Sequence, residues 1–524
     1  MEKRFNITGT CFPERHYMAD VSAKFNTALR LVMNGEYFAI NRPRQYGKTT
    51  MLEALSRELS KSDEWLVFKI SFEGIGSTPF ENAPAFCGTF LRLLETQMKN
   101  WHHDDLAAFL KNESGHVKTM EELSASVTAF AHETGRKLVL LIDEVDKSSN
   151  SQIFLDFLGM LRNKFLNRHE WTDHTFHSVV LAGLHDVKSL KSKIRPDEDA
   201  KYNSPWNIAS DFDVDMSLQP HEIVPMLEDY SQERGVKMDA PAIADALFFY
   251  TSGYPFLVSA LCKITDEKLL PEKTEQTWTL EDIETAANRL VKSERSNTNF
   301  DSLIKNLEND PDLYDLTFRL VIDNEAFSFN VHDPLIYKGI QHGIFRNGGR
   351  LHIHNQIYFE IISNYMVSKL LTQGKSLDLQ TADPYLMPGN VLNFEKVLLK
   401  FQQLLREEYS RKDKDFLERY GRLLFLAFLK PILNAKGYTF KEPEISEERR
   451  LDIAVTFYQH KYVVELKIWR GEEAHQRGIA QLAAYLDRQH LAEGYLVIFD
   501  RRGDKTWKHE WITIEGKQVF AVWV

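Results

Sequence analysis

Three residues near the N-terminus, Gly47, Lys48 and Thr49, have the types and the order of a site that binds phosphate. They stand in the stretch 37–52, YFAINRPRQYGKTTML, after an apolar run and before a good helix-forming sequence. When a strand, a loop with Gly-Lys-Thr and a helix follow one another in this order, backbone N–H groups of the loop and of the helix N-terminus can face a bound phosphate group. Lys48 supplies a mobile charge, and Thr49 can hold Mg²⁺. The stretch departs from G-x-x-x-x-G-K-S/T at Arg42, so a chance Gly-Lys-Thr at a helix start is the alternative at this point.

A second set of chemical side chains, Asp143 and Glu144, ends a strongly apolar stretch. Residues 137–147 read KLVLLIDEVDK, and five consecutive apolar residues fit a strand buried on both faces of a parallel sheet. Asp143 can bind Mg²⁺ through water, and Glu144 can orient and deprotonate an attacking water. A strand that ends in a solvated turn is the alternative, but a phosphate loop and a strand-end Asp-Glu rarely coincide by chance. The two motifs together predict a nucleotide site.

A third set lies near the C-terminus and comprises Asp452, Glu465 and Lys467. Residues 451–457 (LDIAVTF) and 462–469 (YVVELKIW) predict two strands joined by a turn. Glu465 and Lys467 are two residues apart, so they point to the same face of their strand, and a hairpin can bring Asp452 beside them. Two carboxylates can bind Mg²⁺ or Mn²⁺, and a lysine beside them can position a water or stabilise phosphate charge. A Glu-x-Lys pair on a strand also occurs by chance.

The elements that must position the first two sets alternate between strand and helix. Apolar runs predict strands at 37–40, 65–72, 137–143 and 177–183, and amphipathic patterns predict helices at 20–33, 80–101, 120–134 and 153–165. Such alternation implies right-handed crossovers and a mostly parallel sheet. Ligands of such sheets bind at the carboxyl ends of the strands, where both motifs lie.

Helical patterns replace the strands beyond Pro220, at 221–234, 240–251, 255–269 and 280–293. Residues 310–371 predict two helices with a polar hairpin at 344–353, an order that suggests a winged helix. The polar stretch 373–390 contains two prolines and is interpreted as a linker, and a long helical region follows at 394–435. The fold class is therefore α/β, with five predicted parts: a core at 1–219, a helical lid at 220–299, a winged helix at 300–372, a linker at 373–393 and a second α/β domain at 394–524.

The first 370 or so residues resemble bacterial AAA-like ATPases of the STAND class. In that class Arg-Pro-Arg commonly leads into Gly-Lys-Ser/Thr, and residues 42–49, RPRQYGKT, match this variant. Residues 204–209 (SPWNIA), 253–255 (GYP) and 354–358 (HNQIY) are similar to further segments of these proteins, although Gly-Tyr-Pro alone is also an ordinary helix break. The resemblance implies an ATPase with a P-loop and Mg²⁺ held by Thr49 and Asp143. It implies these nucleotide contacts: Arg42, Pro43, Arg44, Gln45, Tyr46, Gly47, Lys48, Thr49, Thr50, Asp143 and, near the adenine, Pro255.

Residues 447–487 resemble the PD-(D/E)xK nuclease domain that is often fused to these ATPases. The resemblance implies a triad of Asp452, Glu465 and Lys467, in which the two carboxylates hold Mg²⁺ or Mn²⁺. Gln481 becomes the helix-borne accessory residue, and Glu418 is the candidate for the first acid of the family. The sequence departs from the family at the motif that contains Asp452, where Arg450-Leu451-Asp452 stands in place of Pro-Asp.

Two functions of different class follow from these motifs. In the first, ATP binding and hydrolysis control a metal-dependent nuclease that acts on DNA, and the domain fusion suggests defence against phage or mobile DNA. In the second, a nucleotide switch controls a nuclease-like domain that only holds nucleic acid or a partner. Glu465 and Lys467 favour the first, because a binding-only domain does not need that pair.

Composition indicates the cellular compartment and the kind of partner to expect. No apolar run has the length of a membrane span, and no signal peptide is expected. The three cysteines (Cys11, Cys87 and Cys262) are far apart, which favours a reducing cytoplasm and argues against disulfides and zinc. The net charge is −11, but residues 391–524 hold 23 Lys and Arg against 20 Asp and Glu. This mildly basic C-terminal part is compatible with a nucleic-acid partner.

Three further sets of residues are weaker candidates. His185 could sense the γ-phosphate, although a solvated loop histidine is favoured. His102 and His103, with the two aspartates that follow them, fit a polar helix end better than a metal site. Arg162 could serve as a finger for a neighbouring subunit in a homo-oligomer, or it could be an ordinary surface arginine.

Overall fold

In the computed structural model the chain divides into two compact units. The first comprises residues 1–283 and 340–343, and the second comprises 284–339 and 344–524. The structure describes residues 2–148, 151–168, 174–184, 208–210, 212, 214–292, 297–322, 325–372, 383–408, 421, 424–429, 432–433, 437–440, 453–458, 460–469, 471–500 and 507–524. The predicted site residues His185, Glu418 and Asp452 lie outside these ranges.

The core of the first unit is a parallel sheet of four strands in the order β1-β4-β3-β2. The register places Asn41 beside Gly183 and Ser71 beside Asp143, so the carboxyl ends of the strands meet at one edge. The sequence prediction of a parallel sheet is therefore confirmed, and both of its phosphate-site motifs lie at this edge. The strands are β1 (Tyr37–Asn41), β2 (Trp65–Ser71), β3 (Lys137–Asp143) and β4 (Ser178–Gly183).

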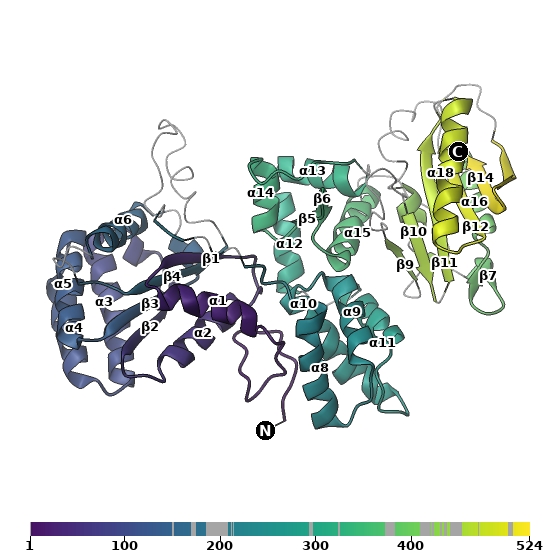
Figure 1. Cartoon of the computed structure of the whole chain (residues 1–524). Coiled ribbons are helices and arrows are strands. Elements are labelled where there is room, and N and C mark those ends of the chain that lie inside the picture. Colours follow the sequence, from purple (N-terminus) through teal and green to yellow (C-terminus); the bar gives the residue numbers. More distant parts are fainter. Residues whose placement is uncertain are drawn as a thin grey trace. The chain divides into compact units, whose positions relative to one another are not determined.

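Helices cover both faces of this sheet, because consecutive residues of its strands are mostly apolar and their side chains point alternately to opposite faces. One face contacts α1 (Ser22–Met33) and α2 (Lys48–Leu59), and the other packs against α3 (Ala83–Asn100), α5 (Met120–Thr134) and α6 (Gln152–Asn167) (Figure 1). The helix α4 (Asp104–His116) packs on α3 and is not predicted by the sequence pattern. Its buried residues are only Ala107 and Leu110, which makes its periodicity weak.

The first unit also contains the helices α8 (Pro220–Arg234), α9 (Ala240–Thr251) and α10 (Pro255–Ile264), which lie in the part of the chain that the sequence predicts as a lid. The predicted helices at 221–234 and 240–251 are confirmed. The third prediction, 255–269, is an α-helix only to Ile264, and a π-helical turn continues it to Leu269. The next helix, α11 (Leu280–Val291), contains the division between the two units.

Four helices and a short hairpin begin the second unit. They are α12 (Thr298–Glu308), α13 (Pro311–Val321), α14 (Pro334–Gln341), β5 (Phe345–Asn347), β6 (Leu351–Ile353) and α15 (Gln356–Thr372). The prediction of two helices in 310–371 is therefore wrong, because α14 is a third. This helix has only eight residues, and Asp333 caps it by accepting hydrogen bonds from two backbone N–H groups of its first turn. The hairpin itself is confirmed, and the winged-helix interpretation stays a prediction.

A six-stranded mixed sheet forms the rest of the second unit, in the order β13-β14-β12-β11-β10-β9. The strands β11, β12 and β14 run parallel, and the remaining neighbours are antiparallel. The strands are β9 (Gly437–Phe440), β10 (Ile453–Phe457), β11 (His460–Ile468), β12 (Glu493–Phe499), β13 (His509–Ile514) and β14 (Lys517–Trp523). Two short strands, β7 (Leu386–Met387) and β8 (Val391–Leu392), occupy part of the stretch that the sequence predicts as a linker.

Two helices cover opposite faces of this mixed sheet. The helix α18 (Glu472–Arg488) buries Ile479 and Leu482 against Val463 and Leu496 on one face. The helix α16 (Phe394–Glu408) places Phe394 against Tyr495 on the other, with the ring centroids 4.7 Å apart. Because Tyr495 and Leu496 are consecutive, their side chains point to opposite faces, and each face is covered by one helix.

Candidate functional sites

The predicted phosphate loop lies between β1 and α2, as its sequence order requires. Gln45 and Gly47 have positive φ angles of 57° and 81°, which turn the chain sharply into the helix. Among the described residues no side chain caps the N-terminus of α2, so its first N–H groups need another acceptor. This arrangement fits an anion at the start of the helix.

Lys48 is almost completely buried in this loop, with 7% of its surface exposed. Its Nζ donates hydrogen bonds to the carbonyl oxygens of Arg42 and Pro43, each at 2.9 Å. Burial lowers the pKa of Lys48, while the nearby carboxylates of Glu144, Asp146 and Asp143 oppose that shift. The ammonium therefore sits between the loop and an acidic strand end, where phosphate oxygens can replace the loop carbonyls as its acceptors.

Arg42 stands where the usual loop has its first glycine, and the structure gives it an anchoring contact. Its backbone N–H donates to the carbonyl oxygen of Gly183 at 3.1 Å, which ties the loop to the end of β4. Its guanidinium donates to the carbonyl oxygens of Asn41 at 2.7 Å and of Val214 at 2.6 Å. Arg42 thus joins the loop to the segment that leads into the lid.

Thr49 and Asp143 are brought together from positions 94 residues apart in the chain. The hydroxyl of Thr49 donates to the carboxylate of Asp143 at 2.6 Å, and Asp143 is 6% exposed. Hydroxyl and carboxylate oxygens are the donors that Mg²⁺ prefers. The donor set of these two residues therefore fits Mg²⁺, as the sequence predicts.

Glu144 follows Asp143 with a positive φ of 53°, which is uncommon for a residue other than glycine. Its backbone N–H donates to the carboxylate of Asp143 at 2.9 Å. Burial raises the pKa of Glu144, and Lys48 partly opposes this shift. A carboxylate with a raised pKa is a stronger base, which suits the removal of a proton from water.

The lid contacts the phosphate loop through two tyrosines, which the sequence analysis does not pair. The hydroxyl of Tyr254 donates to the carbonyl oxygen of Arg44 at 2.5 Å. Its ring meets that of Tyr46 edge-on, with the centroids 4.6 Å apart, and the Tyr46 hydroxyl lies 2.6 Å from that of Ser217. Pro255 is the first residue of α10 and follows this contact directly. The only sign of this contact in the sequence is that Tyr46 lies in the predicted phosphate loop and Tyr254 in the Gly-Tyr-Pro motif.

The chain before the first helix also reaches the loop helix, and sequence reasoning misses this contact. The backbone N–H of Cys11 donates to the hydroxyl of Thr50 at 3.1 Å. Phe5, in the same segment, packs between Tyr17 and Tyr230, and Tyr230 belongs to α8. The N-terminal segment therefore connects the lid to the helix that carries Thr50.

The predicted nuclease hairpin is present in the second unit. Antiparallel pairing of β10 with β11 places Ile453 opposite Val464. Glu465 is 2% exposed, and the Nζ of Lys467 lies 2.6 Å from its carboxylate. The structure thus brings Glu465 and Lys467 together on the face that α18 covers. Asp452 precedes Ile453 in the sequence and lies outside the described residues.

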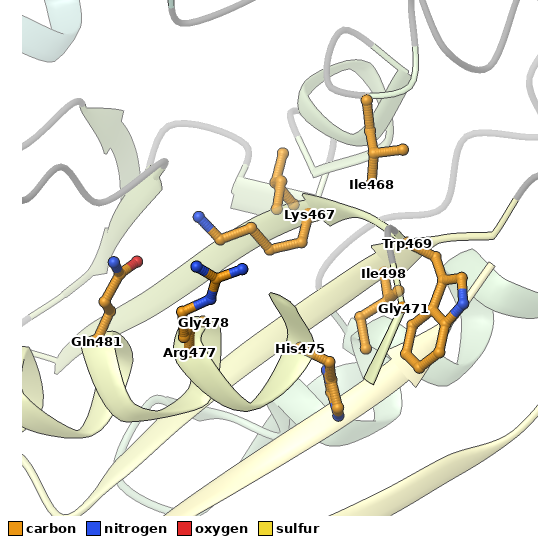
Figure 2. Close-up of a pocket in the computed structure, with 10 residues that line it drawn as sticks. Lys467, Ile468, Trp469, Gly471, His475, Arg477, Gly478, Gln481 and Ile498 are labelled. Atoms are coloured by element: carbon orange, nitrogen blue, oxygen red, sulfur yellow. The ribbon is translucent and has the colours of Figure 1, made fainter. Parts of the chain in front are cut away.

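A cavity of about 470 Å³ opens beside Lys467, between the end of β11 and α18 (Figure 2). Gln481, the predicted accessory residue, lines it together with Arg477, His475 and Trp469. Figure 2 shows Lys467, Arg477 and Gln481 gathered at one end of this space. Glu465 offers carboxylate oxygens of the kind that Mg²⁺ and Mn²⁺ prefer. Within the described ranges no group of three or more His, Cys, Asp or Glu residues could hold a metal ion.

Among the weaker candidates, those that the structure describes do not join either site. His102 and His103 lie between α3 and α4, and the two aspartates form the first turn of α4, so the expected polar helix end is confirmed. Arg162 lies within α6, and its Nε is buried with no hydrogen-bond partner among the described residues. No helix in the described part of the chain is long and apolar enough to cross a membrane.

Comparisons with known proteins point to one family. The sequence model of the AAA-like domain family matches residues 14–360, about two thirds of the chain. No curated protein matches the chain.

Solved structures that match include the Walker-type ATPase PABY2304 of Pyrococcus abyssi, at 12% identity and a TM-score of 0.44, covering 68% of this chain and 99% of that one. The ORC2 protein of Aeropyrum pernix matches at 12% identity and a TM-score of 0.40, covering 70% and 99%. The RuvB Holliday junction branch migration motor of Thermotoga maritima matches at 13% identity and a TM-score of 0.31, covering 66% and 95%.

Proposed function

Because the chain belongs to the AAA-like domain family, and its first unit is a nucleotide-binding P-loop ATPase-like domain, we propose that it binds and hydrolyses ATP with Mg²⁺. We propose further that this cycle controls a metal-dependent nuclease in the C-terminal part of the chain, acting on DNA. The observation that supports the first proposal best is the convergence of Lys48, Thr49, Asp143 and Glu144 at one edge of the sheet.

Each residue of the nucleotide site has a separate task in this proposal. Lys48 exchanges two loop carbonyls for phosphate oxygens of ATP, and the uncapped N-terminus of α2 donates N–H groups to the same phosphates. Thr49 and Asp143 would hold Mg²⁺, which neutralises charge on the phosphates when it is bound. Glu144 accepts a proton from the attacking water and holds that water in line with the γ-phosphate.

The lid supplies the proposed switch. The Tyr254 hydroxyl donates a hydrogen bond to the loop carbonyl of Arg44. A movement of the loop around phosphate would therefore either displace Tyr254 with it or break this hydrogen bond. Pro255 begins the next helix and is the proposed contact to adenine. Since nucleotide would contact the loop and the lid together, its binding favours one arrangement of the two over the others.

The nuclease proposal depends most on the pair of Glu465 and Lys467 beside a cavity that Gln481 also lines. Burial of the Glu465 carboxylate carries a desolvation cost, and the Lys467 ammonium at 2.6 Å offsets part of that cost. Glu465 and Asp452 would hold the metal, which supplies charge neutralisation at the scissile phosphate. Lys467 orients the attacking water, Gln481 supports it, and Glu418 would add a further acid. We include defence against phage or other mobile DNA as the proposed setting.

A second function competes, in which the C-terminal part binds nucleic acid or a partner without cutting. One observation favours it: the described carboxylate of the site, Glu465, is already paired with Lys467. The two functions are separated by incubating the full chain with plasmid, linear duplex and single-stranded DNA, with and without Mg²⁺, Mn²⁺ and ATP. Metal-dependent cleavage that changes with ATP supports the nuclease. The nuclease proposal is overturned if the wild type cuts DNA under none of these conditions. It is also overturned if Glu465→Ala, prepared in parallel, cuts DNA as fast as the wild type.

A further inference from the structure

The cavity beside Lys467 has a charged end and an apolar end. Lys467, Arg477 and Gln481 lie at the first, while Trp469, Ile498 and His475 lie toward the second (Figure 2). Its volume of about 470 Å³ falls in the range of pockets that enclose small molecules, about 300–1,000 Å³. A cavity of this composition suits a ligand that is anionic at one end and flat and apolar at the other.

The charged end is suited to a phosphate group. Lys467 already has Glu465 as its partner, whereas Arg477 forms no ion pair or hydrogen bond with any described residue. A guanidinium presents several N–H donors in a fixed plane, a geometry that matches phosphate oxygens. Gln481 follows one helical turn after Arg477 on α18 and adds an amide donor.

The apolar end is suited to a nucleobase. Trp469 is half-buried, and Ile498 is fully buried on the neighbouring strand β12. The rings of Trp469 and His475 have their centroids 5.5 Å apart. Burial lowers the pKa of His475, which favours the neutral form of its aromatic ring. Aromatic walls of this kind bind the face of an unpaired base.

From these observations we propose that the cavity binds one unpaired nucleotide of single-stranded DNA. Arg477 and Gln481 contact its phosphate, and Trp469 stacks on its base. In a duplex both faces of each base are covered by neighbouring bases, so the pocket can take only a base that has left the stack. The inference rests on the proposed nucleic-acid function of the second unit and narrows its substrate to single strands or to unpaired ends.

The test measures binding rather than cleavage, with the full chain in EDTA so that no metal-dependent cleavage occurs. Fluorescence anisotropy reports the affinity for a labelled 20-nucleotide thymidine strand, for the same strand with abasic sites and for a 20-base-pair duplex. We expect the single strand to bind best and the abasic strand about tenfold more weakly, because stacking contributes about 1–3 kcal/mol per base. Equal affinity for all three probes overturns the inference.

Two substitutions assign the two ends of the pocket. Arg477→Gln should weaken binding of the normal strand and of the abasic strand alike, by about tenfold. It should also reduce the slope of log affinity against log salt by about 0.7, because one phosphate contact is lost. Trp469→Leu should weaken binding of the normal strand only, and Trp469→Phe should restore most of it.

The same helix and sheet provide matched controls. Arg488→Gln changes an arginine near the end of α18, and Trp511→Leu changes an exposed tryptophan on β13; neither residue lines the cavity. Both controls should bind like wild type, and thermal melting checks that every variant is folded.

The outcomes separate this inference from the nuclease proposal. Binding of single strands that depends on Arg477 and Trp469, in a protein that never cuts, supports the pocket and overturns the nuclease. Metal-dependent cleavage that both substitutions leave unchanged, together with unchanged binding, overturns the pocket and keeps the nuclease.

Discussion

We propose different tasks for two residues of the nucleotide site, and substitution separates these tasks. Lys48→Ala removes the buried ammonium and should weaken ATP binding at least tenfold, since hydrogen bonds to a charged group contribute about 1.5–3 kcal/mol. Glu144→Gln keeps the size and polarity of the side chain but removes the base, so binding should persist while turnover falls about a hundredfold or more. Calorimetry measures the binding, and phosphate release measures the turnover. ATP hydrolysis at the wild-type rate by Glu144→Gln would show that another group activates the water.

The raised pKa of Glu144 adds a pH dependence to this prediction. The base works only when it is deprotonated, so kcat/KM should fall as the pH drops through that raised pKa. The loss should therefore begin at a higher pH than for an unperturbed glutamate. A rate that is flat across this acidic range, in a protein that stays folded, contradicts Glu144 as the base.

The two proposed nuclease residues, Glu465 and Lys467, can be separated in the same way, because a carboxylate can be a metal ligand and an ammonium cannot. Glu465→Ala should lose cleavage and weaken Mn²⁺ binding together. Lys467→Ala should lose cleavage by about a hundredfold while Mn²⁺ binding persists, since an ammonium has no lone pair to offer. A fluorescent DNA substrate reports cleavage, and calorimetry reports metal binding. Lys461→Ala, on the same strand but outside the cavity, is the control and should behave like wild type.

At the scale of elements, the junction between the sheet and the lid depends on one glycine. Gly253 has a φ of +72°, and a Cβ on it would lie 2.2 Å from the carbonyl oxygen of Leu218. That neighbour is backbone, and its N–H donates to the carbonyl oxygen of Gly253 at 2.7 Å, so it cannot easily move. The Tyr254 contact to the loop follows directly, and displacement of Gly253 would therefore displace the proposed switch.

Gly235 provides a matched control for this junction, because it also has a positive φ, +66°, but a Cβ would contact nothing within 4 Å. Both substitutions by alanine carry the cost of a left-handed backbone, which is about 1 kcal/mol. Gly253→Ala adds a steric clash, which should lower the free energy of unfolding by about a further 1–3 kcal/mol. Its melting temperature should therefore be lower than that of Gly235→Ala. Its ATP affinity should also fall, while that of Gly235→Ala should not. Equal melting temperatures for the two variants would contradict a tight junction.

At the scale of the whole molecule, the proposed control of the nuclease requires that nucleotide in the first unit changes the chain beyond it. The predicted linker at 373–393 contains Lys375, a site for trypsin. We expect trypsin to cut there at different rates in ATP-bound and nucleotide-free protein, measured by the mass of the fragments over time. Lys48→Ala should show one rate under both conditions. Identical rates in the wild type would count against a switch that reaches the C-terminal part.

The sequence by itself determined the features that depend on neighbouring residues. Predominantly apolar runs predicted all four strands of the parallel sheet, because a strand buried on both faces has few polar positions. The order of strand, loop, Gly-Lys-Thr and helix placed the phosphate site, and the period of two on β11 put Glu465 and Lys467 on one face. These patterns are local, so no knowledge of the partner elements was required. The α4 helix shows the limit, since its stability comes from packing on α3 rather than from a strong pattern of its own.

Only the tertiary structure decided which distant residues meet. Thr49 and Asp143 are 94 positions apart, Tyr46 and Tyr254 are further apart still, and β12 separates β11 from β14 in the second sheet. The pocket of Arg477 and Trp469 likewise exists only because α18 crosses the end of β11. Such contacts follow from the combined packing of whole helices and sheets. A pattern within one segment carries no information about the segment that will cover it.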